Sequence, residues 1–168
     1  MIFVGLGANL VTADHGTPRE ALAAALEALS RAGLRIVARS SWYESAPVPA
    51  SDQPWFVNGV VRVTGGFDPA ELLALLHRTE AAFGRVRRRR NEARVLDLDL
   101  LAYGDIVLDG ADGGPFLPHP RMADRAFVLL PLAEIAPGWR HPATGQTVEA
   151  LIAALPPGQA IRPMAEET

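Results

Sequence analysis

The stretch LRIVARSSWYESAPVPASDQPWFVNGVVRVT, residues 34–64, decides the fold. Residues 34–45 are predicted to form a strand. Pro47, Pro49 and Pro54 then break the chain into a loop, because proline lacks a backbone N–H and disfavours helix at the preceding residue. Residues 55–64 are predicted to form a second strand, antiparallel to the first. Two strands therefore follow one another in this part of the chain.

A helix is predicted on each side of this stretch. Thr17-Pro18-Arg19-Glu20 is typical of a helix start, since threonine can cap the first turn, proline suits the first helical position and glutamate completes a capping box. Gly33 is expected to end this helix. Asp68-Pro69-Ala70-Glu71 repeats the same chemistry before a second helix, which Gly84 is expected to end.

Residues 1–7 and 95–103 are predicted to be the first and last strands in chain order, so that the order is β-α-β-β-α-β. This order predicts an α+β fold of the ferredoxin-like kind, an antiparallel sheet with helices packed on one face. C-terminal additions follow, with hairpin turns in residues 104–114 and helices over residues 125–135 and 147–155. We expect one domain over residues 1–168, with a loose tail after about residue 156.

Composition restricts the classes of function. The 168 residues are 49% hydrophobic, which argues against disorder, and the longest apolar runs are too short to span a membrane. No signal peptide is evident after Met1, so a cytoplasmic location is expected. The absence of cysteine means that any metal must bind oxygen or imidazole. A net charge of −3 argues against a general nucleic-acid binder.

Asp97 and Asp99 stand in the run Leu96-Asp97-Leu98-Asp99-Leu100. Side chains alternate across a strand, so the two carboxylates are expected on one face, with Cα atoms about 6.5–7 Å apart. Neighbouring carboxylates that hold two metal ions are a recurring device for displacement at phosphorus. A half-buried strand with one wet face would show the same pattern, and for an isolated pair that reading is the more common one.

Arginine supplies all 16 basic residues. Six of them lie within ten residues just before the aspartates: Arg85, Arg87, Arg88, Arg89, Arg90 and Arg94. Guanidinium groups bind phosphate oxygens in a bidentate manner, so this loop would suit a polyphosphate. A solvated basic loop or a nucleic-acid patch is the alternative, although the remainder of the chain is not basic.

Two further groups of residues could form a site. The segment Pro118-His119-Pro120-Arg121-Met122, with Arg125 and Phe127, is interpreted as a second cationic wall, although a lone histidine is more often structural. Phe56 and Asn58 share a strand face, where an aromatic ring and an amide could bind a flat heteroaromatic ligand. Each could equally belong to the core or satisfy nearby backbone.

Together and in this order, these segments resemble the 6-hydroxymethyl-7,8-dihydropterin pyrophosphokinase family of folate synthesis. The resemblance runs from Phe3-Val4-Gly5-Leu6-Gly7-Ala8-Asn9-Leu10 to Pro131-Leu132-Ala133-Glu134-Ile135-Ala136-Pro137. Its most specific part is Arg94-Val95-Leu96-Asp97-Leu98-Asp99-Leu100-Leu101, supported by Asp52-Gln53-Pro54 and Gly84-Arg85-Val86-Arg87. The family transfers diphosphate from ATP to the hydroxymethyl group of the pterin and leaves AMP.

The resemblance implies a role for each matching residue. Asp97 and Asp99 would bind two Mg²⁺ ions, and Arg85 and Arg94 would stabilise charge near the transferred group. The remaining ATP contacts would come from His77, Glu80, Leu100, His119 and Arg125. The pterin would contact Ser45, Pro47, Val48, Phe56, Asn58 and Phe127.

The sequence departs from the family pattern at the loop before the aspartates, where Arg87 to Arg90 receive no individual roles. Phe116 replaces a residue that is commonly small and polar. Two other functions remain open on the same fold, an RNA-binding module and a non-catalytic ligand-sensing domain. For the enzyme we expect a monomer whose partners are the small molecules ATP and hydroxymethyl-dihydropterin, with neither nucleic acid nor membrane.

Overall fold

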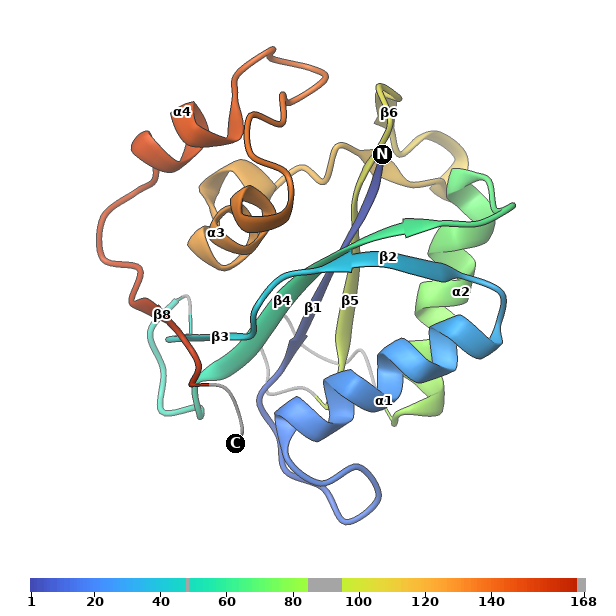
Figure 1. Ribbon diagram of the computed structural model, residues 1–168, viewed down its shortest axis with the longest axis vertical. Helices are drawn as coiled ribbons and strands as arrows, with labels where there is room; N and C mark the ends of the chain where they lie inside the picture. The colour runs from blue at the N-terminus through green and yellow to red at the C-terminus, as the bar shows by residue number, and fades with distance from the viewer. Residues whose placement is uncertain (48, 85–94, 166–168) are drawn as a thin grey trace.

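A computed structural model of the chain describes residues 1–47, 49–84 and 95–165 (Figure 1). Its centre is a six-stranded sheet in the order β5-β1-β4-β3-β8, with β2 also paired to β4. The pairings are antiparallel. The strands are β1 (Ile2–Ala8), β2 (Arg35–Arg39), β3 (Tyr43–Ser45), β4 (Phe56–Thr64), β5 (Asp97–Tyr103) and β8 (Ile161–Pro163).

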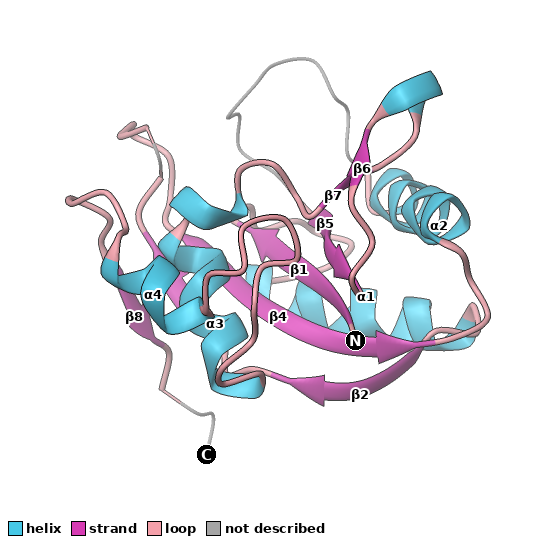
Figure 2. Ribbon diagram, turned by 90° about the horizontal axis from the view of Figure 1, so that it is seen from above, coloured by secondary structure: helices cyan, strands magenta, loops and turns pink. Residues whose placement is uncertain are grey.

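Helices pack against both faces of this sheet (Figures 1 and 2). One apolar cluster joins α1 (Pro18–Arg31) and α2 (Pro69–Ala82) to alternate sheet residues such as Val4 and Leu98. A second cluster joins α3 (Ala126–Ile135) and α4 (Val148–Ala153) to Phe3 and Leu101 on the opposite face. The predicted α+β class is confirmed, but the C-terminal helices cover a second face, whereas we expected helices on one.

Both predicted helix starts are confirmed. The Thr17 side chain accepts the N–H of Glu20, and the Glu20 side chain accepts the N–H of Thr17. Asp68 and Glu71 make the same reciprocal pair at the start of α2. These bonds satisfy N–H groups that lack partners within the helix, which is why the sequence alone identifies them.

The single strand predicted over residues 34–45 is wrong, because the chain breaks between β2 and β3. At the break, the Ser40 N–H still donates to the Val60 carbonyl at 2.9 Å, but the Val60 N–H donates at 3.0 Å to the Ser40 side chain, not to a backbone carbonyl. Trp42 is 4% exposed and packs over Gly59, where a Cβ atom would lie 2.6 Å from the ring. Burying this indole requires the chain to leave the strand path.

The tail is also ordered where we expected it to be loose. Residues 161–163 form β8, which pairs with β3, and the Met164 N–H donates to the Trp42 carbonyl at 2.9 Å. The tail therefore covers an open edge of the sheet, and ladder bonds of this kind offset its loss of conformational freedom.

The strands β6 (Leu108–Asp109) and β7 (Phe116–Leu117) form a short separate ribbon, consistent with the hairpin turns predicted there. Short 3₁₀ helices occupy Ala111–Gly113 (η1) and Met122–Asp124 (η2). Within the described ranges, none of the helices combines the length and apolar character that a bilayer span requires.

Candidate active site

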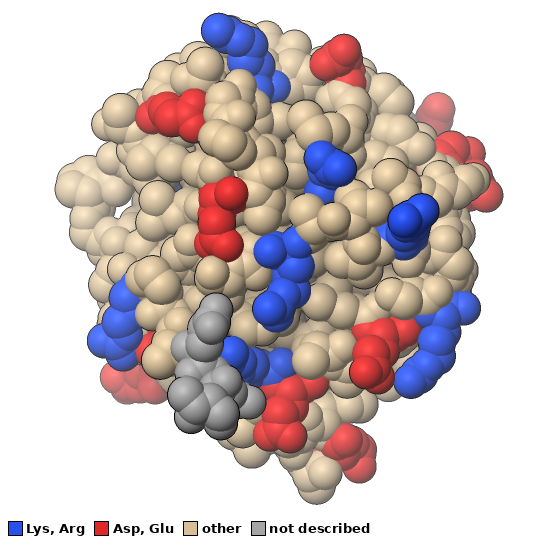
Figure 3. All heavy atoms as spheres, viewed as in Figure 1, with Lys and Arg blue, Asp and Glu red and all other residues tan. Residues whose placement is uncertain are grey.

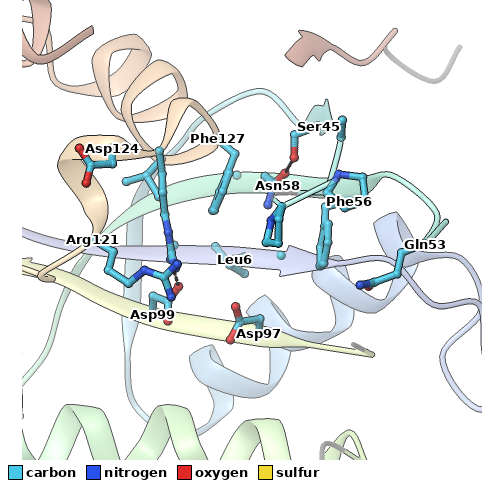
Figure 4. Close-up of a pocket in the computed structure, with 18 residues that line it drawn as sticks. Leu6, Ser45, Gln53, Phe56, Asn58, Asp97, Asp99, Arg121, Asp124 and Phe127 are labelled. Atoms are coloured by element: carbon cyan, nitrogen blue, oxygen red, sulfur yellow. Dashed lines mark hydrogen bonds and ion pairs between the residues drawn. The ribbon is translucent and has the colours of Figure 1, made fainter. Parts of the chain in front are cut away.

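A pocket opens over β1, β4 and β5 on the sheet face that carries α3 (Figure 4). Its walls come from the β3–β4 loop, η2 and the start of α3. The lining residues are Gly5, Leu6, Gly7, Ser45, Ala46, Pro47, Pro49, Gln53, Phe56, Asn58, Gly59, Asp97, Asp99, Arg121, Asp124, Arg125, Phe127 and Val128. The pocket thus brings together residues that are far apart in the sequence, from Gly5 to Val128.

Asp97 and Asp99 lie on the floor of this pocket and are both partly exposed. Leu96, Leu98 and Leu100 point to the other face and are buried, so the predicted alternation is confirmed. On the neighbouring strand, Gly7 pairs with Asp97 and Gly5 pairs with Asp99. Because glycine has no side chain, the space beside each carboxylate stays open.

The carboxylate pair faces a cationic side chain. Arg125 Nη1 lies 3.9 Å from Asp99 Oδ2, and both side chains are partly exposed. His119 Nε2 lies 3.9 Å from Asp99 Oδ1, and Nδ1 accepts the Arg121 N–H at 3.1 Å. Both distances to Asp99 are longer than a hydrogen bond, so these two side chains approach the carboxylate without a direct hydrogen bond between the named atoms.

We predicted that His119 would contribute positive charge to a cationic wall. The lowered pKa makes the ring neutral near pH 7, so that part of the prediction is wrong. Burial lowers the pKa of His119 from 6.5 to about 4, the Arg125 guanidinium acts in the same direction, and the Asp97 carboxylate opposes them. Since Nδ1 accepts a hydrogen bond, the proton of the neutral ring lies on Nε2. His119 therefore presents a neutral donor toward the carboxylates.

The other half of the pocket suits a flat polar ligand. Phe56 and Phe127 stand on either side of an open space, with Asn58 behind them (Figure 4). The Ser45 hydroxyl donates to Asn58 Oδ1, and both residues are buried. This bond fixes the amide orientation. The Arg125 guanidinium lies 5.3 Å from the Phe127 ring centroid, so the two halves of the site meet at these residues.

Asn9 is a residue that the sequence reasoning did not assign to the site. It is 2% exposed, and its Nδ2 donates to Gln53 Oε1 and to the Pro54 carbonyl, each at 3.1 Å. These bonds hold the β3–β4 loop against the end of β1. Gln53 itself lines the pocket, together with Arg121 and Asp124. In the sequence reasoning, Asn9 and Gln53 appeared only as part of the family resemblance, and Arg121 as part of the predicted cationic wall, whereas Asp124 was not singled out.

Four predicted ATP contacts in the described part of the chain are absent from this lining: His77, Glu80, Leu100 and His119, of which His119 lies 3.9 Å from Asp99. Glu80 is 2% exposed, and its carboxylate accepts the Leu98 N–H at 2.8 Å. It therefore fastens α2 to the outer edge of β5. His77 is exposed on the same helix, and the Leu100 side chain is buried.

Some predicted site residues lie outside the described part of the chain. They are Val48, Arg85 and Arg94, together with the unassigned run Arg87 to Arg90. Their expected contacts with the pterin or with phosphate stay predictions.

Paired carboxylates beside an arginine and an aromatic-lined pocket fit the class of enzymes that transfer phosphorus-containing groups between small molecules, because such transfers depend on metal binding and charge neutralisation. Comparison with known proteins narrows this class. Residues 3–137 match the family described as 7,8-dihydro-6-hydroxymethylpterin-pyrophosphokinase (HPPK). The chain belongs to this family and is an ATP-dependent diphosphotransferase.

Individual relatives agree with this result. The chain is 44% identical over 158 residues to a 2-amino-4-hydroxy-6-hydroxymethyldihydropteridine pyrophosphokinase of Pseudomonas aeruginosa, covering 92% of this chain and 91% of that one. It is 42% identical over 156 residues to the protein of the same name from Methylorubrum extorquens, with coverages of 92% and 93%. A Plasmodium falciparum HPPK-DHPS structure superposes with a TM-score of 0.69 at 15% identity, covering 91% of this chain and 45% of that one. At that identity the superposition supports the fold alone.

Proposed function

We propose that this protein transfers diphosphate from ATP to the hydroxymethyl group of 6-hydroxymethyl-7,8-dihydropterin, giving AMP and the pterin diphosphate in folate biosynthesis. One observation carries the proposal. The same pocket holds a carboxylate pair beside Arg125 and, next to it, the aromatic and amide groups of Phe56, Asn58 and Phe127. Such a site can hold a metal–phosphate complex and a flat heterocycle side by side.

The carboxylate pair fits Mg²⁺. Magnesium prefers oxygen ligands and usually combines one or two carboxylates with waters and substrate phosphates, rather than a complete cage of protein ligands. The described residues accordingly contain no cluster of three or more metal-binding side chains, whereas Asp97 and Asp99 share one floor. We propose that these two residues hold two Mg²⁺ ions together with ATP. The ions would neutralise charge on the phosphate oxygens.

On the phosphate side, Arg125 would bind phosphate oxygens directly. His119 would donate a hydrogen bond through Nε2 as a neutral ring. Arg85 and Arg94 are proposed near the transferred group by family resemblance. These groups would stabilise the negative charge that spreads over the phosphate oxygens during transfer.

On the pterin side, Phe56 and Phe127 would stack on the two faces of the ring system. Because Ser45 donates to Asn58 Oδ1, that oxygen keeps a second lone pair, and the Asn58 Nδ2 hydrogens would donate to the ligand edge. Backbone groups at Ser45, Pro47 and Val48 would complete the contact. Stacking and edge recognition together would select a pterin.

The adenine would lie along the outer edge of β5. Leu98 directs its N–H away from β1 toward Glu80, and backbone directions alternate along a strand, so Leu100 turns its backbone groups to the same side. That geometry supports backbone recognition of the base by Leu100. His77 is proposed as a further nucleoside contact. Glu80 would act here by holding β5 in place.

In the proposed reaction, the pterin hydroxyl oxygen forms a bond to the β-phosphorus, the bond from that phosphorus to the α,β-bridging oxygen breaks, and AMP leaves with the bridging oxygen. The hydroxyl proton would pass to solvent water. Asp97 and Asp99 would help to orient this hydroxyl, and positioning supplies much of the rate enhancement in such transfers.

The order β5-β1-β4-β2, with α1 and α2 on one face, supports our proposal that the scaffold is ferredoxin-like. We further propose one domain over residues 1–168, a monomer and a cytoplasmic location.

On the face seen in Figure 3, acidic side chains and arginines are interspersed, which gives no support there to an RNA-binding patch. The ligand-sensing alternative rests on fold alone.

The test is AMP release from ATP and the pterin alcohol at several Mg²⁺ concentrations. We expect AMP with no ADP, and no product without the metal. Asp97→Asn should lower kcat by about a hundredfold or more, because a neutral amide binds Mg²⁺ weakly. Asp105→Asn, an exposed change in a turn, is the control. Formation of ADP in place of AMP would overturn the proposal.

A further inference from the structure

The tail between α4 and the end of the described chain touches both walls of the pocket. It lies beyond residues 3–137, the part of the chain that matches the family. In Figure 1 it descends from α4 past α3 to β3. The elements that it joins, the start of α3 and the end of β3, carry Phe127 and Ser45 of the pterin side of the site.

Gln159 makes the first of these contacts. Its Nε2 donates to the Asp124 carbonyl at 2.8 Å, and its Oε1 accepts the Ala126 N–H at 2.9 Å. Arg125 lies between these two bonded residues in the chain. One amide side chain therefore clamps the backbone on both sides of the arginine that lies 3.9 Å from Asp99.

The clamp also replaces a missing helix cap. Arg125 is the N-cap residue of α3, and it makes no capping bond with its own side chain. The first N–H groups of a helix need acceptors from outside the helix. Gln159 supplies one to Ala126, the first residue of the helix, and Phe127 follows directly.

The residues after Gln159 hold the opposite wall. The Ala160 carbonyl accepts the Ala46 N–H at 3.0 Å, and Ile161 pairs with Ser45. Arg162 then donates to Glu44 Oε2 at 2.8 Å. Gln159 directly precedes this paired segment, so its backbone is held against β3. The two hydrogen bonds of its side chain therefore fix the start of α3 relative to Ser45.

We infer that Gln159 is a positioning residue for diphosphate transfer, one that aims Arg125 at the phosphates and Phe127 at the pterin. This inference rests on the proposed function. Misplacement of a binding group by about 1 Å can cost on the order of a hundredfold in rate, so loss of both bonds should lower kcat by about tenfold. The KM for the pterin should also rise several-fold, because Phe127 lies in the first turn of α3, next to Ala126, whose N–H loses its acceptor.

The experiment compares Gln159→Ala with Gln159→Met, which has a similar length but makes neither hydrogen bond. Gln146→Ala is the control, since that exposed glutamine lies between α3 and α4, away from the pocket lining. kcat and both KM values are measured at a temperature where melting curves show each variant to be folded. If Gln159→Ala fails to fold, Gln159→Met carries the test. We expect the control to match wild type.

A double-mutant comparison separates positioning from general loosening. If Gln159 acts on kcat through Arg125, then Gln159→Ala should change kcat by less than about twofold in an Arg125→Ala background. A tenfold fall that persists in that background would overturn the inference, as would wild-type kinetics in both Gln159 variants. A wild-type protein that releases no AMP would instead overturn the proposed function, and the inference with it.

Discussion

Gly7→Ala tests whether pterin binding requires a residue without a side chain at this position of the sheet. Gly7 lies near the C-terminal end of β1, between Asp97 on β5 and Asn58 on β4. A Cβ atom at this position would approach Asn58 Nδ2 to 3.0 Å, with the next neighbour, the Val57 carbonyl oxygen, at 3.9 Å. The conflict is therefore confined to the amide that we propose to recognise the ligand.

The size of the effect follows from that contact. A separation of 3.0 Å is too short for comfortable packing of a methyl group, so the amide must move by a few tenths of an ångström. The Ser45 hydroxyl holds the other end of the amide, which makes the movement costly. Loss of about one neutral hydrogen bond to the pterin corresponds to about 1 kcal/mol, or roughly a fivefold rise in the KM for the pterin.

The assay is AMP release at saturating ATP with varied pterin, together with thermal melting to establish folding. Gly5→Ala is the comparison, because a Cβ atom there would meet the Leu101 side chain at 3.4 Å, an ordinary contact. Its KM for the pterin should change by about twofold or less. The reasoning is refuted if Gly7→Ala leaves this KM unchanged, or if both alanines raise it equally.

Three further changes test other parts of the molecule. Glu80→Ala should lower the free energy of unfolding by about 2 kcal/mol in denaturant unfolding, because the buried Leu98 N–H loses its acceptor. Glu80→Gln should lower it by less, and equal losses in the two variants would contradict this role. His119 has a pKa of about 4 when folded and 6.5 when exposed, so the unfolded chain binds the proton more readily. Wild-type stability should therefore fall as the pH drops from 6.5 to 4, by at most about 3 kcal/mol, and His119→Asn should remove that part of the pH dependence; an unchanged slope would exclude His119 as the cause. Gly59→Ala should cost about 1–3 kcal/mol of stability through collision with the Trp42 ring, and an unchanged melting temperature would show that the ring moves freely.

The family resemblance and much of the fold were predictable from the sequence, because the relevant signals are local. The capping pairs Thr17 with Glu20 and Asp68 with Glu71 join residues three apart. Strand alternation likewise placed Asp97 and Asp99 on one face without knowledge of their neighbours. Wherever the partner of a residue lies within one helical turn or one strand, the sequence contains the information.

The tertiary structure decided the features that depend on distant partners. The contacts of Asn9 with Gln53 and of Gln159 with Ala126 join residues 44 and 33 positions apart, and no local pattern indicates either. For the same reason the ordered tail and the buried role of Glu80 were not foreseen. The charge of His119 also depends on packing, because burial next to Arg125 keeps the ring neutral. The sequence alone determined which chemical groups the protein carries and the face of β5 on which the carboxylates lie, whereas long-range packing decided which of these groups meet in the pocket and in what state of charge.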